Sequence, residues 1–149
     1  MNVSELCNPF VVCAQRTTPL PDAARLMREH HVGSLVVVDE SGKGRVPVGM
    51  LTDRDIVVAV VAGEVDPRTL TAGEVMAGDL ATLRAGDSAE SALRLMRRRG
   101  IRRVPVVSEA GTLTGIVTLD DLLEKVAEQL SDAVRAIASE QLHETRVRK

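Results

Sequence analysis

The chain has 149 residues, enough for one well-filled core or for two half-sized units that share a core. Its hydrophobic fraction of 44% and charged fraction of 27% are those of an ordinary globular protein. A formal net charge of -2 gives no overall attraction to polyanions, and Phe10 is the only aromatic residue, so stacking surfaces for single-stranded nucleic acid are scarce. Binding to nucleic acid is therefore disfavoured.

The first residues of the chain contain no basic region followed by a long apolar run, and no apolar stretch reaches the roughly 18 to 20 residues of a membrane span. We therefore expect a cytoplasmic protein with no membrane partner. Cys7 and Cys13 are too few for a disulfide scaffold. The adjacent His30 and His31 do not share a helix face, so no metal site is expected.

The apolar spacing predicts a first set of elements: a strand near residues 11–13, a helix over 21–31, strands over 34–38 and 46–51, and a helix over 53–62. Residues 63–73, which include Asp66 and Pro67, form a linker. A second set follows in the same order, with a strand ending at Thr82 and Leu83 and a helix capped by Ser88 and ended by Gly100. Strands over 104–107 and 113–118 and a helix from Leu119 complete it.

The second set is an internal repeat of the first. RLMR at residues 25–28 returns at residues 94–97, an offset of 69, and GMLTDRDIV at 49–57 returns as GIVTLDDLL at 115–123, an offset of 66. The three-residue difference falls in a turn that contains glycine and charged residues, where insertions are tolerated.

A long amphipathic helix, or a pair of helices, is predicted at the C-terminal end of the chain. No Gly or Pro follows Asp121, and Ser131 is a possible restart cap. Apolar residues recur there at steps of three to five: Leu122, Val126, Leu130, Val134, Ile137 and Leu142. The apolar surface exceeds what an isolated tail exposes, so we expect it to pack on a second subunit or a partner; folding back on the module is the alternative.

The repeated segments begin with GMLT at 49–52 and GIVT at 115–118, which we call the GxxT segments. The threonine of each starts a Thr-x-x-Asp pattern at the beginning of a helix, Thr52 with Asp55 and Thr118 with Asp121. A hydroxyl there can donate to a phosphate oxygen, the helix N-terminus favours the same negative charge, and a carboxylate one turn later can accept both hydroxyls of a ribose. The same spacing also fits a capping box, in which the two side chains only satisfy the helix's own N–H groups.

The two ordered copies closely resemble the cystathionine-β-synthase (CBS) domain, through HVGSLVVVD at 31–39, IRRVPVV at 101–107 and the two GxxTxxD segments. The resemblance implies an α/β (α+β) fold of two tandem β-α-β-β-α repeats, packed through their sheets into one pseudo-two-fold module, with an added C-terminal amphipathic helix. The predicted boundaries are residues 3–62 for the first repeat, 63–73 for the linker, 74–130 for the second repeat and 131–149 for the helical tail.

The resemblance also implies a regulatory module without catalysis, and no nucleophile elbow, P-loop or dinucleotide fingerprint is present. In this family the ligand is an adenosine nucleotide (AMP, ADP, ATP) or a related adenosyl compound, held in clefts between the repeats, and no cofactor is required. We expect a homodimer that acts on an unknown protein in trans. A scaffold that has lost its ligand is the alternative, and nucleic-acid binding is a distant third.

Matching the family's motifs residue by residue gives the candidate ligand-binding residues. In the first repeat they are Thr52, Arg54 and Asp55 at the turn, Val32, Gly33 and Ser34 at the strand start, and Cys13 upstream. In the second they are Thr118 and Asp121, the strand residues Ile101, Arg102, Arg103, Val104 and Pro105, and Thr82 upstream.

Two differences between the copies bear on these candidates. Cys13 stands where the second copy has Thr82, and Arg54 stands where it has Asp120, so the two sites are expected to be unlike. Strand alternation sends Arg102 and Arg103 to opposite faces, so one of them can reach a phosphate, and Pro105 is expected to fix a strand edge. Residues 97–99, three further arginines, are interpreted as a solvated helix face.

Overall fold

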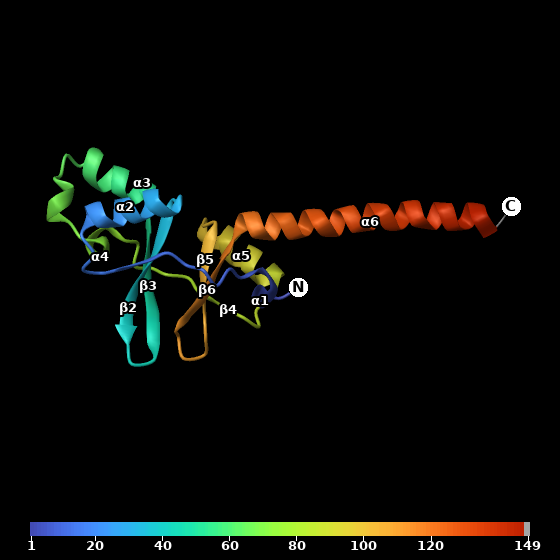
Figure 1. Cartoon of the computed structure of the whole chain (residues 1–149), viewed down its shortest axis with the longest axis horizontal. Coiled ribbons are helices and arrows are strands. Elements are labelled where there is room, and N and C mark those ends of the chain that lie inside the picture. The colour runs from blue at the N-terminus through green and yellow to red at the C-terminus, as the bar shows by residue number, and fades with distance from the viewer. Residues whose placement is uncertain (148–149) are drawn as a thin grey trace.

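The computed structural model describes residues 1–147 and contains two three-stranded sheets, one from each repeat, whose hairpins hang side by side beneath the helices (Figure 1). In the first sheet the strand order is β1-β2-β3, with β1 parallel to β2 and β2 antiparallel to β3. The elements are β1 (Cys13–Gln15), α2 (Leu20–His30), β2 (Ser34–Ser41) and β3 (Gly44–Thr52). The mixed α/β fold with its paired repeats is as predicted, although β1 begins two residues later.

The second sheet repeats this arrangement with the order β4-β5-β6. Its elements are β4 (Leu83–Arg84), α5 (Ala89–Arg99), β5 (Arg103–Val107) and β6 (Leu113–Thr118). The first hairpin is the longer one because the extra residues of the first copy extend β2 and β3. Pro105 lies in the central strand, not at an edge; β4 pairs only with Val106 and Val107, so at Pro105 the strand has a neighbour on one side alone.

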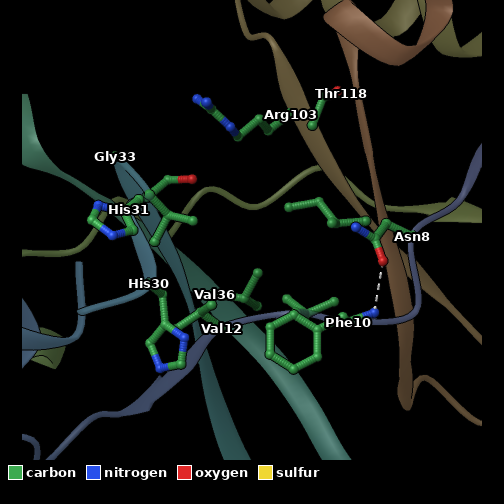
Figure 2. A pocket seen from close by; sticks show the side chains of 13 residues that line it. Asn8, Phe10, Val12, His30, His31, Gly33, Val36, Arg103 and Thr118 are labelled. Atoms are coloured by element: carbon green, nitrogen blue, oxygen red, sulfur yellow. Dashed lines mark hydrogen bonds between the residues drawn. The ribbon is translucent and has the colours of Figure 1, made fainter. Parts of the chain in front are cut away.

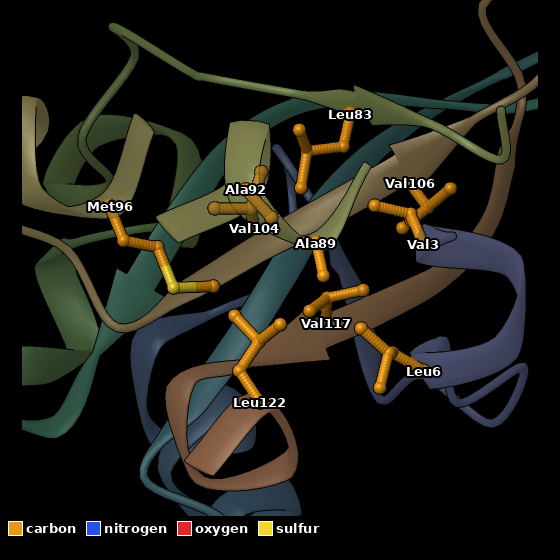
Figure 3. Packing of buried hydrophobic residues seen from close by; sticks show 10 residues of the cluster. All are labelled: Val3, Leu6, Leu83, Ala89, Ala92, Met96, Val104, Val106, Val117 and Leu122. Carbon is orange, nitrogen blue, oxygen red and sulfur yellow. The ribbon is translucent and has the colours of Figure 1, made fainter. Parts of the chain in front are cut away.

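The two repeats exchange their first helices. Val3 and Leu6 of α1 (Val3–Leu6) are buried in the core of the second repeat with Leu83, Met96 and Leu122 (Figure 3). Ala72 of α4 (Ala72–Val75) is buried in the core of the first repeat, with Leu70 and Met76 packed against it. Each core therefore depends on a segment from the other half of the chain, which ties the repeats into one module.

Four isolated backbone bridges join the two halves of the chain, and two of them cross a GxxT segment: Asn8 pairs with Ile116 of β6, and Ala77 pairs with Met50 of β3. Each crossing chain passes directly over the glycine of a GxxT segment. A Cβ atom on Gly115 would lie 2.8 Å from the Asn8 carbonyl oxygen, and one on Gly49 would lie 2.7 Å from that of Ala77. Because real Cβ atoms do not approach a carbonyl this closely, only glycine permits the crossing.

The caps of the second repeat's helix follow the sequence prediction. The Ser88 side chain accepts a hydrogen bond from the Ser91 N–H at 3.0 Å, as an N-cap does. Gly100 ends α5 with φ 66°, in the left-handed region that glycine enters without strain.

The last helix of the first repeat is shorter in its regular part than predicted. α3 (Asp53–Ile56) is followed by a π-helical turn over Val57–Val61, and a 3₁₀ turn, Pro67–Thr69, lies in the segment that leads to α4. The π-helical turn is rich in valine, whose branched side chains are poorly accommodated in a regular helix.

The C-terminal segment is one continuous helix, α6 (Leu119–Val147), that projects far beyond the module (Figure 1). Ser131 lies within it, so the predicted restart cap is wrong. The helix does not fold back, because its residues from Leu123 to Val147 are exposed apart from the half-buried Lys125. The last two residues of the predicted tail lie outside the described part of the chain. No helix in that part is apolar enough over a sufficient length to cross a membrane.

Candidate functional site

A cleft of about 320 Å³ opens between the two repeats (Figure 2). Its apolar wall comes from the residues that precede β1 and from β2, including Val11, Val12 and Val36. The second repeat contributes Ile116 and Thr118 of β6 and Arg103 of β5. The volume lies within the range of small-molecule sites, which are mostly apolar with a few converging polar groups.

The chain crossing at Asn8 places Phe10 at the mouth of this cleft. The Asn8 side-chain oxygen accepts a hydrogen bond from the Phe10 N–H at 3.0 Å, which turns the chain after its bridge to Ile116 (Figure 2). The Phe10 ring is 70% exposed and lies 6.3 Å from the His30 ring, centroid to centroid, at 52°. The single aromatic residue of the protein is therefore free to contact a bound ring.

His31, beside the cleft, holds an unusual backbone conformation at the end of α2. Its φ of 54° is in the left-handed region, where its counterpart Gly100 stands in the second repeat. The His31 and Val32 N–H groups both donate to the Met27 carbonyl, so the helix end determines this conformation. The backbone of any residue other than glycine is strained in this region, and such strain tends to persist at functional sites.

Gly33 presents its backbone to the cleft at the point where the first repeat's last helix begins. Its carbonyl accepts a hydrogen bond from the Asp53 N–H at 2.9 Å, and a Cβ at this position would lie 3.0 Å from the Asp53 carboxylate. Val32, Gly33 and Ser34, all predicted as ligand contacts, line the cleft.

Arg103 and Arg102 diverge as strand alternation requires. Arg102 forms an exposed ion pair with Asp120 at 3.2 Å. Arg103 lines the cleft and has no ion pair or side-chain hydrogen bond within the described part of the chain (Figure 2). An unpaired guanidinium beside an apolar cavity is suited to an anionic group, and its planar fork matches phosphate or carboxylate oxygens.

The two Thr-x-x-Asp segments are used differently. Thr52 and Asp55 form a reciprocal capping box: the Thr52 hydroxyl accepts from the Asp55 N–H at 3.1 Å, and the Asp55 carboxylate accepts from the Thr52 N–H at 2.9 Å. Neither side chain lines the cleft. The Thr118 hydroxyl accepts from the Asp121 N–H at 3.2 Å and faces the cleft, so its proton remains available to a ligand.

The cleft thus combines the strand start of the first repeat with the threonine of the second, a combination that matching the motifs copy by copy does not predict. Arg54 and Asp55 lie instead around a separate hollow beside Val58 and Glu74. Asp121 lines another, next to Glu5 and Glu124. Val104 and Pro105 are buried, with Ile101 half-buried, so they support the strand rather than face this cavity.

The upstream pair, Cys13 and Thr82, does not reach the cleft. The Cys13 thiol accepts a hydrogen bond from the Arg45 guanidinium at 3.3 Å, and Thr82 is exposed just before β4.

Burial raises the pKa of the Cys13 thiol, and the positive charge of Arg45 offsets part of that rise. Burial likewise raises the pKa of Cys7, partly offset by a hydrogen bond with the Ile116 backbone. Neither thiol is activated as a nucleophile.

No cluster of three or more His, Cys, Asp or Glu residues suited to a metal ion occurs among residues 1–147. The polar and aromatic cleft residues that the sequence did not predict are Asn8, Phe10, His30 and His31, which the chain crossing and the end of α2 bring there. The apolar lining residues that it did not predict are Val11, Val12, Val36 and Ile116. Two signals could have found the first group: the single aromatic residue lies outside every predicted helix and strand, and His31 occupies the position of a helix-ending glycine.

Comparison with known proteins agrees with this architecture. The sequence profile described as CBS domain matches residues 3–62 and again residues 72–128. The chain belongs to the CBS domain family. This CBS protein is 38% identical over 136 residues to hypoxic response protein 1 of Mycobacterium tuberculosis, covering 91% of this chain and 92% of the relative. It is 36% identical over 144 residues to CBS domain-containing protein YhcV of Bacillus subtilis, covering 95% and 99%. It is 35% identical to an uncharacterized protein of Methanopyrus kandleri, and the match covers 83% of this chain. The chain spans only 62% of the length of that relative.

Solved structures of CBS proteins have the same fold. The crystal structure of Hypoxic Response Protein I with two coordinated zinc ions superposes with a TM-score of 0.73 at 37% identity, covering 83% of this chain and 98% of the other. The cytosolic domain of the Mg²⁺ channel MgtE in complex with ATP gives a TM-score of 0.70 at 30% identity, covering 83% of this chain and 48% of the other.

Proposed function

We propose that this CBS protein is a regulatory sensor that binds an adenosine nucleotide or a related adenosyl ligand in the cleft between its repeats. The observation that carries the proposal is that the Arg103 guanidinium, which has no ion pair in the described part of the chain, and the exposed Phe10 ring line the same cavity, one wall of which is apolar. An aromatic face suits a purine base, and a guanidinium suits a phosphate or carboxylate group. The ATP complex of the MgtE domain supports the choice of ligand class.

Binding in this cleft would be read out through the packing of the two repeats. Gly33 and Ser34 belong to the first repeat and Arg103 and Thr118 to the second, so a ligand that contacts both groups favours the arrangement that brings them together. The response is limited by the ligand's difference in affinity between the two arrangements. A partner protein that binds one arrangement better than the other then receives the signal.

A ligand-free scaffold is the second candidate, and the Thr52–Asp55 capping box favours it. Each side chain accepts a hydrogen bond from the backbone N–H of the other residue, at 2.9 Å and 3.1 Å, so both already serve as the helix cap without a ligand. The scaffold would keep the paired fold as a docking surface, and adenosyl compounds would not change its stability.

Thermal-shift measurements with AMP, ADP, ATP, NAD and S-adenosylmethionine separate the two candidates, because a ligand that binds only the folded state raises Tm. We expect at least one of these compounds to raise Tm. Arg103→Ala should lower the affinity for that compound roughly tenfold, because a charge-assisted hydrogen bond is lost. Its matched control, Arg102→Ala, removes an equally charged neighbour that faces Asp120 and should leave affinity within about twofold.

Two results would sink the sensor proposal. One is a Tm that no compound in the panel changes at saturating concentration. The other is equal loss of affinity in Arg103→Ala and Arg102→Ala, which would mean that net charge alone, and no specific contact, attracts the compound.

A further inference from the structure

The cleft between the repeats is lined by basic side chains and, among residues 1–147, by no acidic one. Its three basic residues are Arg103 from the second repeat and His30 and His31 from the first. The Asp53 carboxylate lies close to Gly33, but it accepts a hydrogen bond from the N–H of the following residue at 2.8 Å and does not line the cleft. A bound ligand therefore meets basic groups with no lining carboxylate to offset them.

The acidic residues that follow Thr118 in the sequence are also directed elsewhere. Asp120 pairs with Arg102 at 3.2 Å, outside the cleft. Asp121 lines a separate hollow beside Glu5. The second repeat thus contributes a guanidinium to the cleft and keeps its carboxylates out of it.

The uncharged polar side chains of the cleft are disposed to donate hydrogen bonds. The Asn8 side-chain oxygen already accepts from the Phe10 N–H, so its amide nitrogen is left to donate. The Thr118 hydroxyl already accepts from the Asp121 N–H, so its proton is left as well. Together with the Arg103 guanidinium these groups form a set of donors, and oxygen atoms of an anion can accept from several of them at once.

We propose that the cleft selects its adenosyl ligand by charge, binding nucleoside phosphates and discriminating against S-adenosylmethionine. The inference rests on the proposed function and narrows it. A nucleoside monophosphate brings about two negative charges near neutral pH, which the donors can meet. S-adenosylmethionine carries a sulfonium and an ammonium group against a single carboxylate. Even with that carboxylate on Arg103, the two cationic groups would lose water without gaining a lining carboxylate in exchange.

Arg103 is the residue that we expect to determine this selection. A guanidinium keeps its charge throughout the physiological pH range, and this one has no ion pair in the part of the chain that the structure describes. Figure 2 shows its side chain extending from β5 toward the strand start at Gly33. Its counterpart at the offset of 69 is the uncharged Ser34, which lines the same cleft, so the permanent charge comes from the second repeat alone.

Three compounds that share adenosine but differ in charge at the 5′ position test the proposal by isothermal titration calorimetry: AMP, 5′-methylthioadenosine and S-adenosylmethionine. We expect the wild type to bind AMP about tenfold more tightly than the uncharged methylthioadenosine, and S-adenosylmethionine most weakly. Methylthioadenosine or S-adenosylmethionine bound as tightly as AMP overturns the selection by charge but leaves the sensor proposal standing. A chain that binds none of the three overturns both.

Reversing the charge sharpens the test. Arg103→Glu turns an attraction into a repulsion, so AMP affinity should fall about a hundredfold and S-adenosylmethionine affinity should rise about threefold, while methylthioadenosine changes little. The matched control is Arg102→Glu, which makes the same change of charge outside the cleft and should keep the wild-type order of affinities. An Arg103→Glu protein that retains the wild-type ratio of AMP to S-adenosylmethionine affinity overturns the proposal.

Circular dichroism and Tm without ligand show whether each variant is folded. Should Arg103→Glu not fold, Arg103→Gln removes the charge while keeping a side chain of similar length. It should bring the affinities for AMP and methylthioadenosine to within about threefold of each other. A full wild-type preference for AMP in Arg103→Gln would likewise overturn the role of this guanidinium.

Discussion

The two repeats place different side chains at equivalent positions of the same frame. Phe10 and His30 correspond, at the offset of 69, to Asp79 and Arg99. In the first repeat the two rings lie 6.3 Å apart beside an open cleft. In the second, the Arg99 guanidinium donates to the Asp79 carbonyl at 2.7 Å and pairs with its carboxylate at 3.1 Å. Arg99 is thus tied to the segment that follows the chain crossing, and it remains exposed, as the solvated helix face predicted for residues 97–99 implies.

The backbone around the two sites is much less divergent than the side chains. Both chain crossings run over a glycine, and both helices α2 and α5 end in a left-handed residue, yet that residue is His31 at one and Gly100 at the other. Gly33 likewise corresponds to Arg102. The comparison teaches that the duplicated frame is kept by glycines and short bridges, while the chemistry of each site has changed independently. We therefore expect the site beside Phe10 to be the one that binds a ligand.

The largest effect is expected at the chain crossings. Gly115→Ala brings a methyl group against the Asn8 carbonyl and the Cys7 sulfur, so the crossing chain must move, and we expect a loss of ~2 to 4 kcal/mol in the free energy of unfolding. Gly49→Ala meets the flexible Met76 as well as Ala77 and should cost less. Urea denaturation measures both.

The matched control for this prediction is Gly78→Ala, because a Cβ at Gly78 meets no atom within 4 Å. It should change the free energy of unfolding by less than ~0.5 kcal/mol. Equal losses in Gly115→Ala and Gly78→Ala would mean that the crossing glycine has no special role.

A smaller effect is expected at the cleft mouth. Phe10→Ala removes the exposed ring and should lower the affinity for the adenosyl compound found by thermal shift roughly tenfold, since stacking contributes ~1 to 3 kcal/mol per base. Asp79→Ala alters the equivalent position of the second repeat and should leave affinity unchanged. Isothermal titration calorimetry measures both, and an effect of Asp79→Ala as large as that of Phe10→Ala would remove the distinction between the two sites.

The smallest effect concerns the two helix ends. Gly100→His puts a side chain into the left-handed conformation and should destabilise the protein by ~1 kcal/mol. His31→Gly relieves the corresponding strain, but glycine is also freer in the unfolded chain, which offsets part of the gain. We expect a net stabilisation of the protein by ~0.5 kcal/mol. Opposite signs in urea denaturation support the comparison; a loss of stability in His31→Gly would show that the His31 side chain stabilises the fold.

The repeat and most of its elements could be predicted because α2 and α5 have regular apolar spacing and recognisable ends. The exchange of first helices could not, since Val3 and Leu6 make too short a pattern to indicate which core they enter. At the site, Val32, Gly33, Ser34, Arg103 and Thr118 were predicted individually, but not that the strand start of one repeat faces the threonine of the other. That depends on how the sheets pack, which local patterns do not encode.

The Thr-x-x-Asp segments show the same limit. The spacing alone is compatible with a phosphate and ribose site or with a helix cap, and the structure shows that Thr52 and Asp55 form the cap. Thr118 stands in the same Thr-x-x-Asp pattern, but it lines the cleft, and its hydroxyl accepts from the Asp121 N–H and so keeps a proton to donate. The same pattern thus lies in different tertiary surroundings in the two repeats, which the sequence alone does not show.

The most direct test of a single working cleft is the stoichiometry of ATP binding, measured by isothermal titration calorimetry on the wild-type chain and on Phe10→Ala, with AMP and S-adenosylmethionine as alternative titrants. The account predicts one molecule bound per chain, with that binding weakened roughly tenfold in Phe10→Ala. Two molecules per chain with similar affinity, or one molecule whose affinity Phe10→Ala leaves unchanged, would contradict it.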